Sequence, residues 1–222
     1  MTGRIWCGCA AVLGMFVGTS AALADVIPLG GGWEAKTPDG GAVSIVVDTV
    51  GNDFLVIEIA KDFTEPPGVG GVFPPILIDF NQVAPDAGTV PRIIIADEAI
   101  TNLTGVPWLD FHWALLNEGE AWFNVPLSAS FSVDPYTNKT FSDPGNVFGD
   151  PNKATDLEAD GGVVPAGSTF FPGGAPGDGA LVMDIDLSRE PPVSFTLKEF
   201  PTPEPGAFML FALAALALRR RG

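Results

Sequence analysis

The chain has 222 residues, of which 46% are hydrophobic and 17% charged, a composition that supports one folded domain rather than disorder. Its 27 acidic residues outnumber the 11 lysines and arginines and give a formal net charge of −16. Such a charge repels phosphate backbones and anionic lipid headgroups, so we expect neither nucleic acid nor an electrostatically bound membrane as a partner.

The first 24 residues are typical of a secretory signal peptide. Arg4 supplies a short positive start, residues 10–18 are small and apolar, and Ala22 and Ala24 satisfy the small-x-small rule for cleavage. The apolar run is well short of the ~20 residues that a membrane span requires, which argues against an N-terminal anchor. We therefore expect export, with cleavage after Ala24.

The part of the chain between the two terminal signals differs from the full chain in both cysteine content and charge. Cys7 and Cys9 are the only cysteines, so the mature chain is expected to lack disulfides, thiolate metal sites and a cysteine nucleophile. All 27 acids but only seven basic residues lie between Asp25 and Glu204, which gives this span a net charge of −20. Such a surface attracts cations.

Apolar residues alternate with polar ones through most of the remaining chain, and this period of two predicts strands. Residues 42–50 and 53–60 flank the turn dipeptide Gly51-Asn52 and predict a β-hairpin. Further strands are predicted at 76–80, 92–96, 108–116, 121–125, 129–133, 181–187 and 193–200. The number and spacing of these strands indicate an all-β domain over residues 25–200, an antiparallel β-sandwich or jelly roll, with an up-and-down barrel as the less favoured alternative.

The most distinctive internal string runs from Asn102 to Trp113 and reads NLTGVPWLDFHW. On a regular strand Trp108, Asp110 and His112 would share one face, and Leu109, Phe111 and Trp113 the core face. The first face combines an aromatic ring with a hydrogen-bonding pair, which suits the binding of a sugar ring. A purely structural use of these residues, with His112 held by its neighbouring aspartate, is the favoured alternative.

The residues available for catalysis point away from several enzyme classes. His112 is the only histidine, so a zinc site with two or three histidines is excluded, and no G-x-S-x-G motif accompanies it. A glycan hydrolase would need two carboxylates, for which Glu118 and Glu120 are the best pair, although a turn is the more natural place for them. No catalytic residue is therefore assigned.

Residues 134–180 contain 15 glycines and prolines and predict a long acidic loop. Asp156, Glu158, Asp160 and Gly161 match the first half of an EF-hand-type calcium loop, but the twelfth position is a glycine where a glutamate is required. A candidate calcium site is formed from the acidic and amide side chains of this loop, Asp150, Asn152, Asp156, Glu158 and Asp160. The alternative is a solvated acidic loop, and no other cofactor is expected.

The C-terminus has three successive parts. Prolines 201, 203 and 205 predict an extended stalk, residues 207–218 form an apolar helix-prone run, and Arg219, Arg220 and Arg221 follow it. As a helix the run is ~18 Å long, short for a membrane span of ~30 Å, and the arginines favour the cytoplasmic side. We expect a single short transmembrane helix there.

Together, Pro203, Glu204, Pro205, the apolar run and the three arginines resemble the PEP-CTERM sorting signal, also called an ice-binding protein C-terminal domain. The resemblance covers residues 201–222. It implies processing by an exosortase, brief residence in the inner membrane, and transfer to the surface or exopolysaccharide matrix of a Gram-negative bacterium. The string from Asn102 to His112 is also similar to one found in other exported proteins that carry this signal.

These features together predict an exported structural or carbohydrate-binding protein rather than an enzyme. Its expected partners are the export machinery, an exosortase and exopolysaccharide. A secreted glycan hydrolase with paired carboxylates remains the alternative. Ice binding is not expected, because flat, regular threonine ladders are absent from the sequence.

Overall fold

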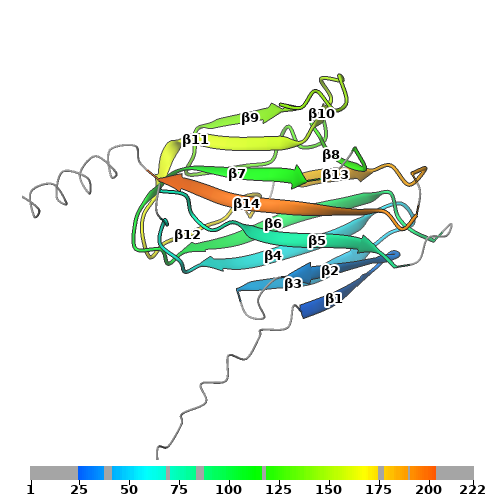
Figure 1. The fold of residues 1–222 in the computed structure, drawn as a ribbon, viewed down its shortest axis with the longest axis horizontal. Helices are drawn as coiled ribbons and strands as arrows, with labels where there is room; N and C mark the ends of the chain where they lie inside the picture. Colours follow the sequence, from blue (N-terminus) through cyan, green and yellow to red (C-terminus); the bar gives the residue numbers. More distant parts are fainter. Residues whose placement is uncertain are drawn as a thin grey trace, which may run out of the picture.

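The computed structural model describes residues 25–37, 42–68, 71–83, 88–116, 119–174, 178–189 and 191–203. The predicted signal peptide and the segment from Glu204 onward lie outside the described residues. Within the described ranges the chain is entirely strands and connections, which confirms the all-β prediction (Figure 1). These ranges hold no helix of the length and apolar character needed to cross a membrane.

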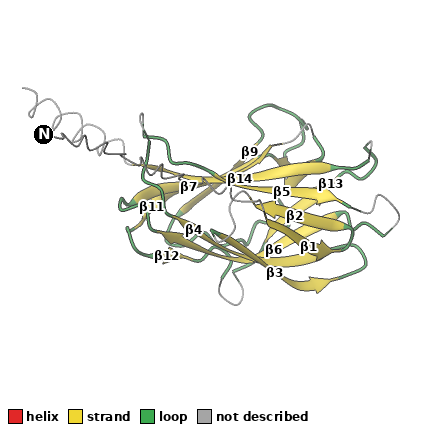
Figure 2. Cartoon of the chain, turned by 60° about the horizontal axis from the view of Figure 1, so that its bottom comes forward, coloured by secondary structure: helices red, strands yellow, loops and turns green. Residues whose placement is uncertain are grey.

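The fourteen strands of the described residues form two sheets that face each other as a sandwich (Figure 2). Sheet A has the order β1 (Asp25–Gly30), β2 (Trp33–Thr37), β5 (Ile76–Gln82), β14 (Ser194–Pro203), β7 (Trp108–Leu116), β11 (Asp156–Val164) and β9 (Asn138–Ser142). Sheet B has the order β10 (Lys153–Ala154), β8 (Ala121–Asn124), β13 (Leu181–Ile185), β6 (Arg92–Asn102), β4 (Leu55–Phe63) and β3 (Val43–Val50), with β12 (Thr169–Phe170) also paired to β6.

The chain crosses repeatedly between the sheets, and one crossing produces a parallel pair. The β3–β4 hairpin is antiparallel, as predicted from its turn. After β4 the chain enters sheet A as β5 and returns to sheet B as β6, which lies beside β4 in the same direction. Parallel neighbours need such a crossover. The expected antiparallel pairing is therefore confirmed for most strand pairs of the described residues, and β4 with β6 is the exception.

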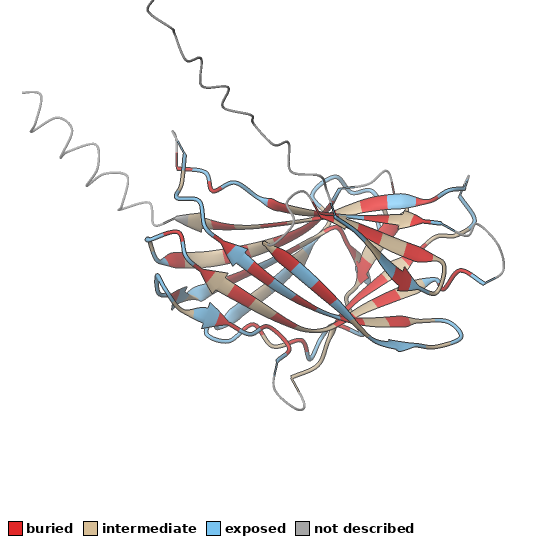
Figure 3. Ribbon diagram, turned by 90° about the horizontal axis from the view of Figure 1, so that it is seen from below, coloured by how far each residue is buried: buried red, intermediate tan, exposed pale blue. Residues whose placement is uncertain are grey.

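Inward-facing residues of both sheets form a single aromatic-rich core, visible as the alternation of buried and exposed positions along the strands (Figure 3). Trp108, Phe111 and Trp113 of β7 are fully buried. The Phe63 ring of sheet B lies edge-on to both Trp108 and Phe111, with ring centroids 5.2 and 5.7 Å away. Such edge-to-face contacts stabilise the packing of the two sheets beyond the burial of area alone.

Two sequence predictions of local structure are wrong. Residues 134–180 are not one loop, because they contain β9 to β12, and the glycines and prolines lie mainly in the turns between these strands. Residues 129–133 form no strand. Phe131 and Val133 are nevertheless buried, and the Lys139 ammonium donates hydrogen bonds to the carbonyls of Ser128, Ala129 and Phe131, so these carbonyls need no neighbouring strand.

Residues 201–203, predicted as the start of the proline stalk, belong to β14 instead. Pro201 is buried, and β14 continues to Pro203. β14 pairs with β5 only as far as Glu199, whereas its pairing with β7 continues to Pro203. One side of the strand therefore has no neighbour beyond Glu199, and a proline can occupy such an edge without losing a ladder hydrogen bond.

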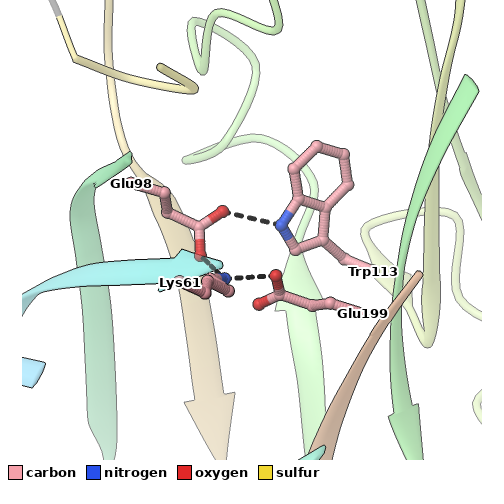
Figure 4. Close-up of polar contacts among 4 residues, drawn as sticks. All are labelled: Lys61, Glu98, Trp113 and Glu199. Atoms are coloured by element: carbon pink, nitrogen blue, oxygen red, sulfur yellow. Dashed lines mark hydrogen bonds and ion pairs between the residues drawn. The ribbon is translucent and has the colours of Figure 1, made fainter. Parts of the chain in front are cut away.

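A buried ionic cluster joins the two sheets (Figure 4). Lys61 of β4 donates a 2.5 Å hydrogen bond to Glu98 Oε1 of β6 and a second one to Glu199 Oε2 of β14. The indole N–H of Trp113 donates to Glu98 Oε2 at 2.7 Å. The side chains of Lys61, Glu98 and Glu199 are all 0% exposed, so water has no access to the cluster.

The protonation of this cluster follows from its burial. Burial and the nearby Glu98 carboxylate together raise the pKa of Glu199 to about 8, against the smaller opposing effect of Lys61. Burial alone disfavours the charged form of Lys61, but the two carboxylates outweigh it and raise the lysine pKa. At neutral pH the cluster therefore holds a charged Lys61 and a protonated Glu199.

The raised pKa of Glu199 makes stability depend on pH. The folded state binds a proton that the unfolded chain releases near pH 4.5, so this contribution is complete below pH 4.5 and is lost as the pH rises toward about 8. We expect the free energy of unfolding, measured with urea from pH 5 to 8.5, to fall by at least ~1 kcal/mol more in the wild type than in Glu199→Gln. The exposed control Glu58→Gln should follow the wild type. If the free energy of unfolding changed with pH in the same way in the wild type and in Glu199→Gln, the raised pKa of Glu199 would be contradicted.

Candidate functional site

Side-chain hydrogen bonds in the first half of the string at residues 102–113 stabilise the loop between β6 and β7. Asn102 is fully buried, and its amide donates to the carbonyls of Val106 at 2.9 Å and Val164 at 3.2 Å. Its carbonyl oxygen accepts from the backbone N–H and the hydroxyl of Thr104. The Trp108 indole N–H also donates to the Thr104 hydroxyl, at 3.3 Å. These residues therefore have a structural role.

Trp108 does not share a face with Asp110 and His112, contrary to the expectation from the sequence. On β14, Thr202 and Pro203 are consecutive, but their partners on β7 are Asp110 and Trp108, so Leu109 is an extra residue on β7. Such a β-bulge reverses the alternation of side chains. Trp108 consequently enters the core together with Phe111 and Trp113. The predicted core position is thus confirmed for Phe111 and Trp113. It is wrong for Leu109, which is only half-buried.

Asp110 and His112 lie on the outer face of sheet A, each about one-fifth exposed. Neighbouring strands contribute to the same surface, because Glu158 of β11 and Phe200 of β14 both pair with His112 across the sheet. The His112 ring stacks on Phe200, with centroids 4.8 Å apart and planes inclined by 10°. Ligand atoms of Asp110, His112 and Glu158 all lie within 4.8 Å of one another. We call these three residues the outer-face triad.

Asp110 is held in place by Thr202 at the end of β14. Its Oδ1 accepts the Thr202 backbone N–H at 2.7 Å, and its Oδ2 accepts the Thr202 hydroxyl. Partial burial tends to raise the pKa of Asp110, but the nearby His112 side chain and the hydrogen bonds from Thr202 outweigh it and hold the pKa below the usual value. Asp110 is therefore an ionised acceptor at neutral pH, with a fixed orientation.

The candidate calcium loop is not assembled. Asp156, Glu158 and Asp160 lie on the extended strand β11, where side chains on the same face are ~6.6 Å apart and do not converge on one ion. Asp150 instead accepts hydrogen bonds from the backbone and side chain of Asn152, in the turn before β10. That turn leads into sheet B, whereas β11 belongs to sheet A.

A groove of about 510 Å³ opens beside β12, and we call it the Phe171 groove. Its wall contains the exposed ring of Phe171, two carboxylates and two hydroxyl groups, and its lining residues are Asp134, Pro135, Val163, Val164, Pro165, Ser168, Thr169, Phe170, Phe171, Gly174 and Asp178. Phe170 is buried and lies edge-on to Phe111 and Tyr136, so the aromatic core supports the floor. The volume is within the ~300–1,000 Å³ range of small-ligand sites.

Close packing beside the groove explains why residues 161 and 162 are both glycines. Gly161 has a φ of +76°, and a Cβ on Gly162 would approach the Pro135 carbonyl oxygen to 2.2 Å. Two glycines therefore allow residues 135–136 to pass directly over the bulged end of β11, where Val163 and Val164 enter the groove wall.

Several functional candidates from the sequence are not brought together in the described structure. Glu120 lies in the bend before β8, and Glu118 lies outside the described residues, as do Ala22, Ala24, Glu204, Pro205 and Arg219 to Arg221. Pro203 ends β14. Sequence reasoning missed Phe200 and Thr202, which the pairing of β14 with β7 places beside His112 and Asp110. It also missed Phe171 and Asp178 of the groove.

The role of Asn102 predicts a large stability difference between two asparagines. Asn102→Ala removes the side-chain partner of the Val164 carbonyl and of the Thr104 N–H, and it should lower the free energy of unfolding by about 1–3 kcal/mol for each group left unsatisfied. Asn138→Ala, at an exposed position of β9, should change it by less than about 0.5 kcal/mol. Urea denaturation at pH 7 measures both, and equal effects would show that the Asn102 contacts are not stabilising.

Comparison with protein-family models, with curated proteins and with solved structures finds no match to this chain. A functional conclusion must therefore come from the residues and contacts of the chain itself.

Proposed function

We propose that this chain is an exported, non-catalytic protein that binds a neutral polysaccharide in the Phe171 groove. It would act at the cell surface or in the extracellular matrix of a Gram-negative bacterium, after an N-terminal signal peptide and a C-terminal sorting signal have directed it there. Its β-sandwich, of jelly-roll type or otherwise, would serve as a rigid support for this groove. Nucleic acid is not among its proposed partners.

The composition of the Phe171 groove is the observation that carries this proposal. The Phe171 side chain is 56% exposed, an unusual position for a phenylalanine that lies beside a concave surface. The apolar face of a sugar ring can pack on such a ring. Asp134 and Asp178 line the same groove, and their carboxylates can accept hydrogen bonds from sugar hydroxyls.

The charge of the chain selects the class of polysaccharide. The span from Asp25 to Glu204 carries a net charge of −20, and two of the groove residues are aspartates. An acidic polysaccharide would be repelled by this surface. A neutral glycan avoids this repulsion and keeps the aromatic and hydrogen-bonding contacts.

The position of the sorting motif agrees with processing that leaves the domain intact. β14 ends at Pro203, where the Pro203-Glu204-Pro205 sequence begins. Cleavage by an exosortase near this motif would remove the apolar run and the arginines but none of the residues that pair with β7 before Pro203. The proposed product is a released domain that has passed only transiently through the inner membrane.

Glycan binding should depend on Phe171 and on the groove carboxylates. We expect Phe171→Ala and Asp178→Asn each to weaken binding of neutral hexasaccharides, β-1,4-glucan and α-1,4-glucan among them, by about tenfold or more. Isothermal titration calorimetry measures this, and Leu103→Ala, which truncates a 49% exposed leucine outside the groove, is the matched control.

Two results would change the conclusion from this titration. Equal affinity of Phe171→Ala and the wild type would remove the groove as the binding site. Shortening of the hexasaccharides, detected by mass spectrometry and lost in Asp134→Asn or Asp178→Asn, would favour the glycan hydrolase alternative, because both carboxylates line the groove.

Sorting is tested by expressing the full chain in hosts with and without an exosortase. The expected product begins at Asp25, ends near Pro205 and leaves the membrane fraction only when the exosortase is present, as measured by intact-mass spectrometry after fractionation. A product that retains Arg219 to Arg221 in the inner membrane of both hosts would show that the tail is an ordinary anchor.

A further inference from the structure

We propose that the outer-face triad, Asp110, His112 and Glu158, binds one divalent transition-metal ion such as Zn²⁺. This site is separate from the Phe171 groove and does not depend on glycan binding. The three residues come from the adjacent strands β7 and β11, and Glu158 pairs directly with His112. One ligand atom from each residue lies within 4.8 Å of the other two, so a single ion between them can reach all three.

The spacing of the first two ligands is already close to that of a bound ion. With metal–ligand bonds of ~2.1 Å, two ligands of a tetrahedral ion are ~3.4 Å apart. His112 Nε2 is 3.6 Å from Asp110 Oδ1. Glu158 is exposed, so rotation of its flexible side chain can shorten the remaining distances without disturbing the sheet.

Neighbouring groups fix the orientation of these two ligands. Thr202 donates its backbone N–H and its hydroxyl to the two carboxylate oxygens of Asp110. Phe200 stacks on one face of the His112 ring. Contacts of this kind orient metal ligands, and their loss in known metal sites typically costs ~10–100-fold in affinity. Little ordering of Asp110 and His112 is then required when the ion binds.

The ligand types favour a transition metal over calcium. Calcium takes six to eight oxygen ligands, whereas the triad supplies one imidazole nitrogen and two carboxylates. Imidazole is a preferred ligand of Zn²⁺, Cu²⁺ and Ni²⁺. Asp110 and His112 are partly exposed and Glu158 is exposed, so a fourth position on the ion stays open to water or to a ligand group.

The test is a titration of the full chain with Zn²⁺, using protein purified without a polyhistidine tag because His112 is the only histidine of the chain. Glu158→Gln removes one ligand at an exposed position of β11, and Glu58→Gln makes the same change at an exposed position of β4. We expect saturable binding of one ion per chain, weakened about tenfold or more by Glu158→Gln and unchanged by Glu58→Gln. His112→Gln should abolish it while the melting temperature without metal confirms that the variant is folded.

A second measurement identifies the histidine ligand directly. Electron paramagnetic resonance of the chain with one equivalent of Cu²⁺ should show coupling to an imidazole nitrogen, which His112→Gln removes. Two results would overturn the proposal. Equal losses in Glu158→Gln and Glu58→Gln, or a Cu²⁺ spectrum without imidazole coupling, would mean that cations bind only diffusely to the acidic surface.

Discussion

The buried Lys61 ties the two sheets together, and the central part of the sandwich depends on it. Its ammonium lies between Glu98 of its own sheet and Glu199 of the opposite sheet, without access to water. A buried charge that loses a partner is far more costly than a lost apolar contact, so only a small range of relative sheet positions is compatible with this cluster. Trp113, which donates to Glu98, belongs to the strand that carries Asp110 and His112. The interior contact to Glu98 and two of the three triad residues thus belong to the same strand.

β7 has two roles because of a single extra residue. Before the bulge at Leu109, Asn102, Thr104 and Trp108 satisfy one another and the neighbouring backbone. After the bulge, Asp110 and His112 face outward beside Glu158. Without the bulge Trp108 would lie beside His112, and the core would lose the ring that packs on Phe63. The structure thus places the polar residues of one continuous string in two settings, a buried network before the bulge and the outer face of sheet A after it.

The period of two was enough to predict the β3–β4 hairpin, β7 and the general character of the fold. It missed β11, because Asp156, Glu158 and Asp160 suggested a calcium loop, although Leu157 and Ala159 between them are fully buried. Lys61 is in phase with the inward-facing Ile57 and Ile59, so the buried lysine left a signal in the sequence. Only part of the outer-face triad could be predicted from the sequence. His112 and Asp110 follow from β7 alone, but Glu158, Phe200 and the bulge depend on which strands become neighbours. Sequence periodicity does not specify that pairing.

The place of β14 in sheet A determines when the domain can fold. It is the last strand among the described residues, yet it lies between β5 and β7 and supplies Glu199 to the buried cluster. Until residues up to Pro203 are available, β5 and β7 have no partner between them and Lys61 has only one of its two glutamate partners. The core therefore cannot close progressively from the N-terminus during synthesis. It must close after the final strand has emerged, and a chain truncated before β14 would expose two unpaired strand edges that invite aggregation.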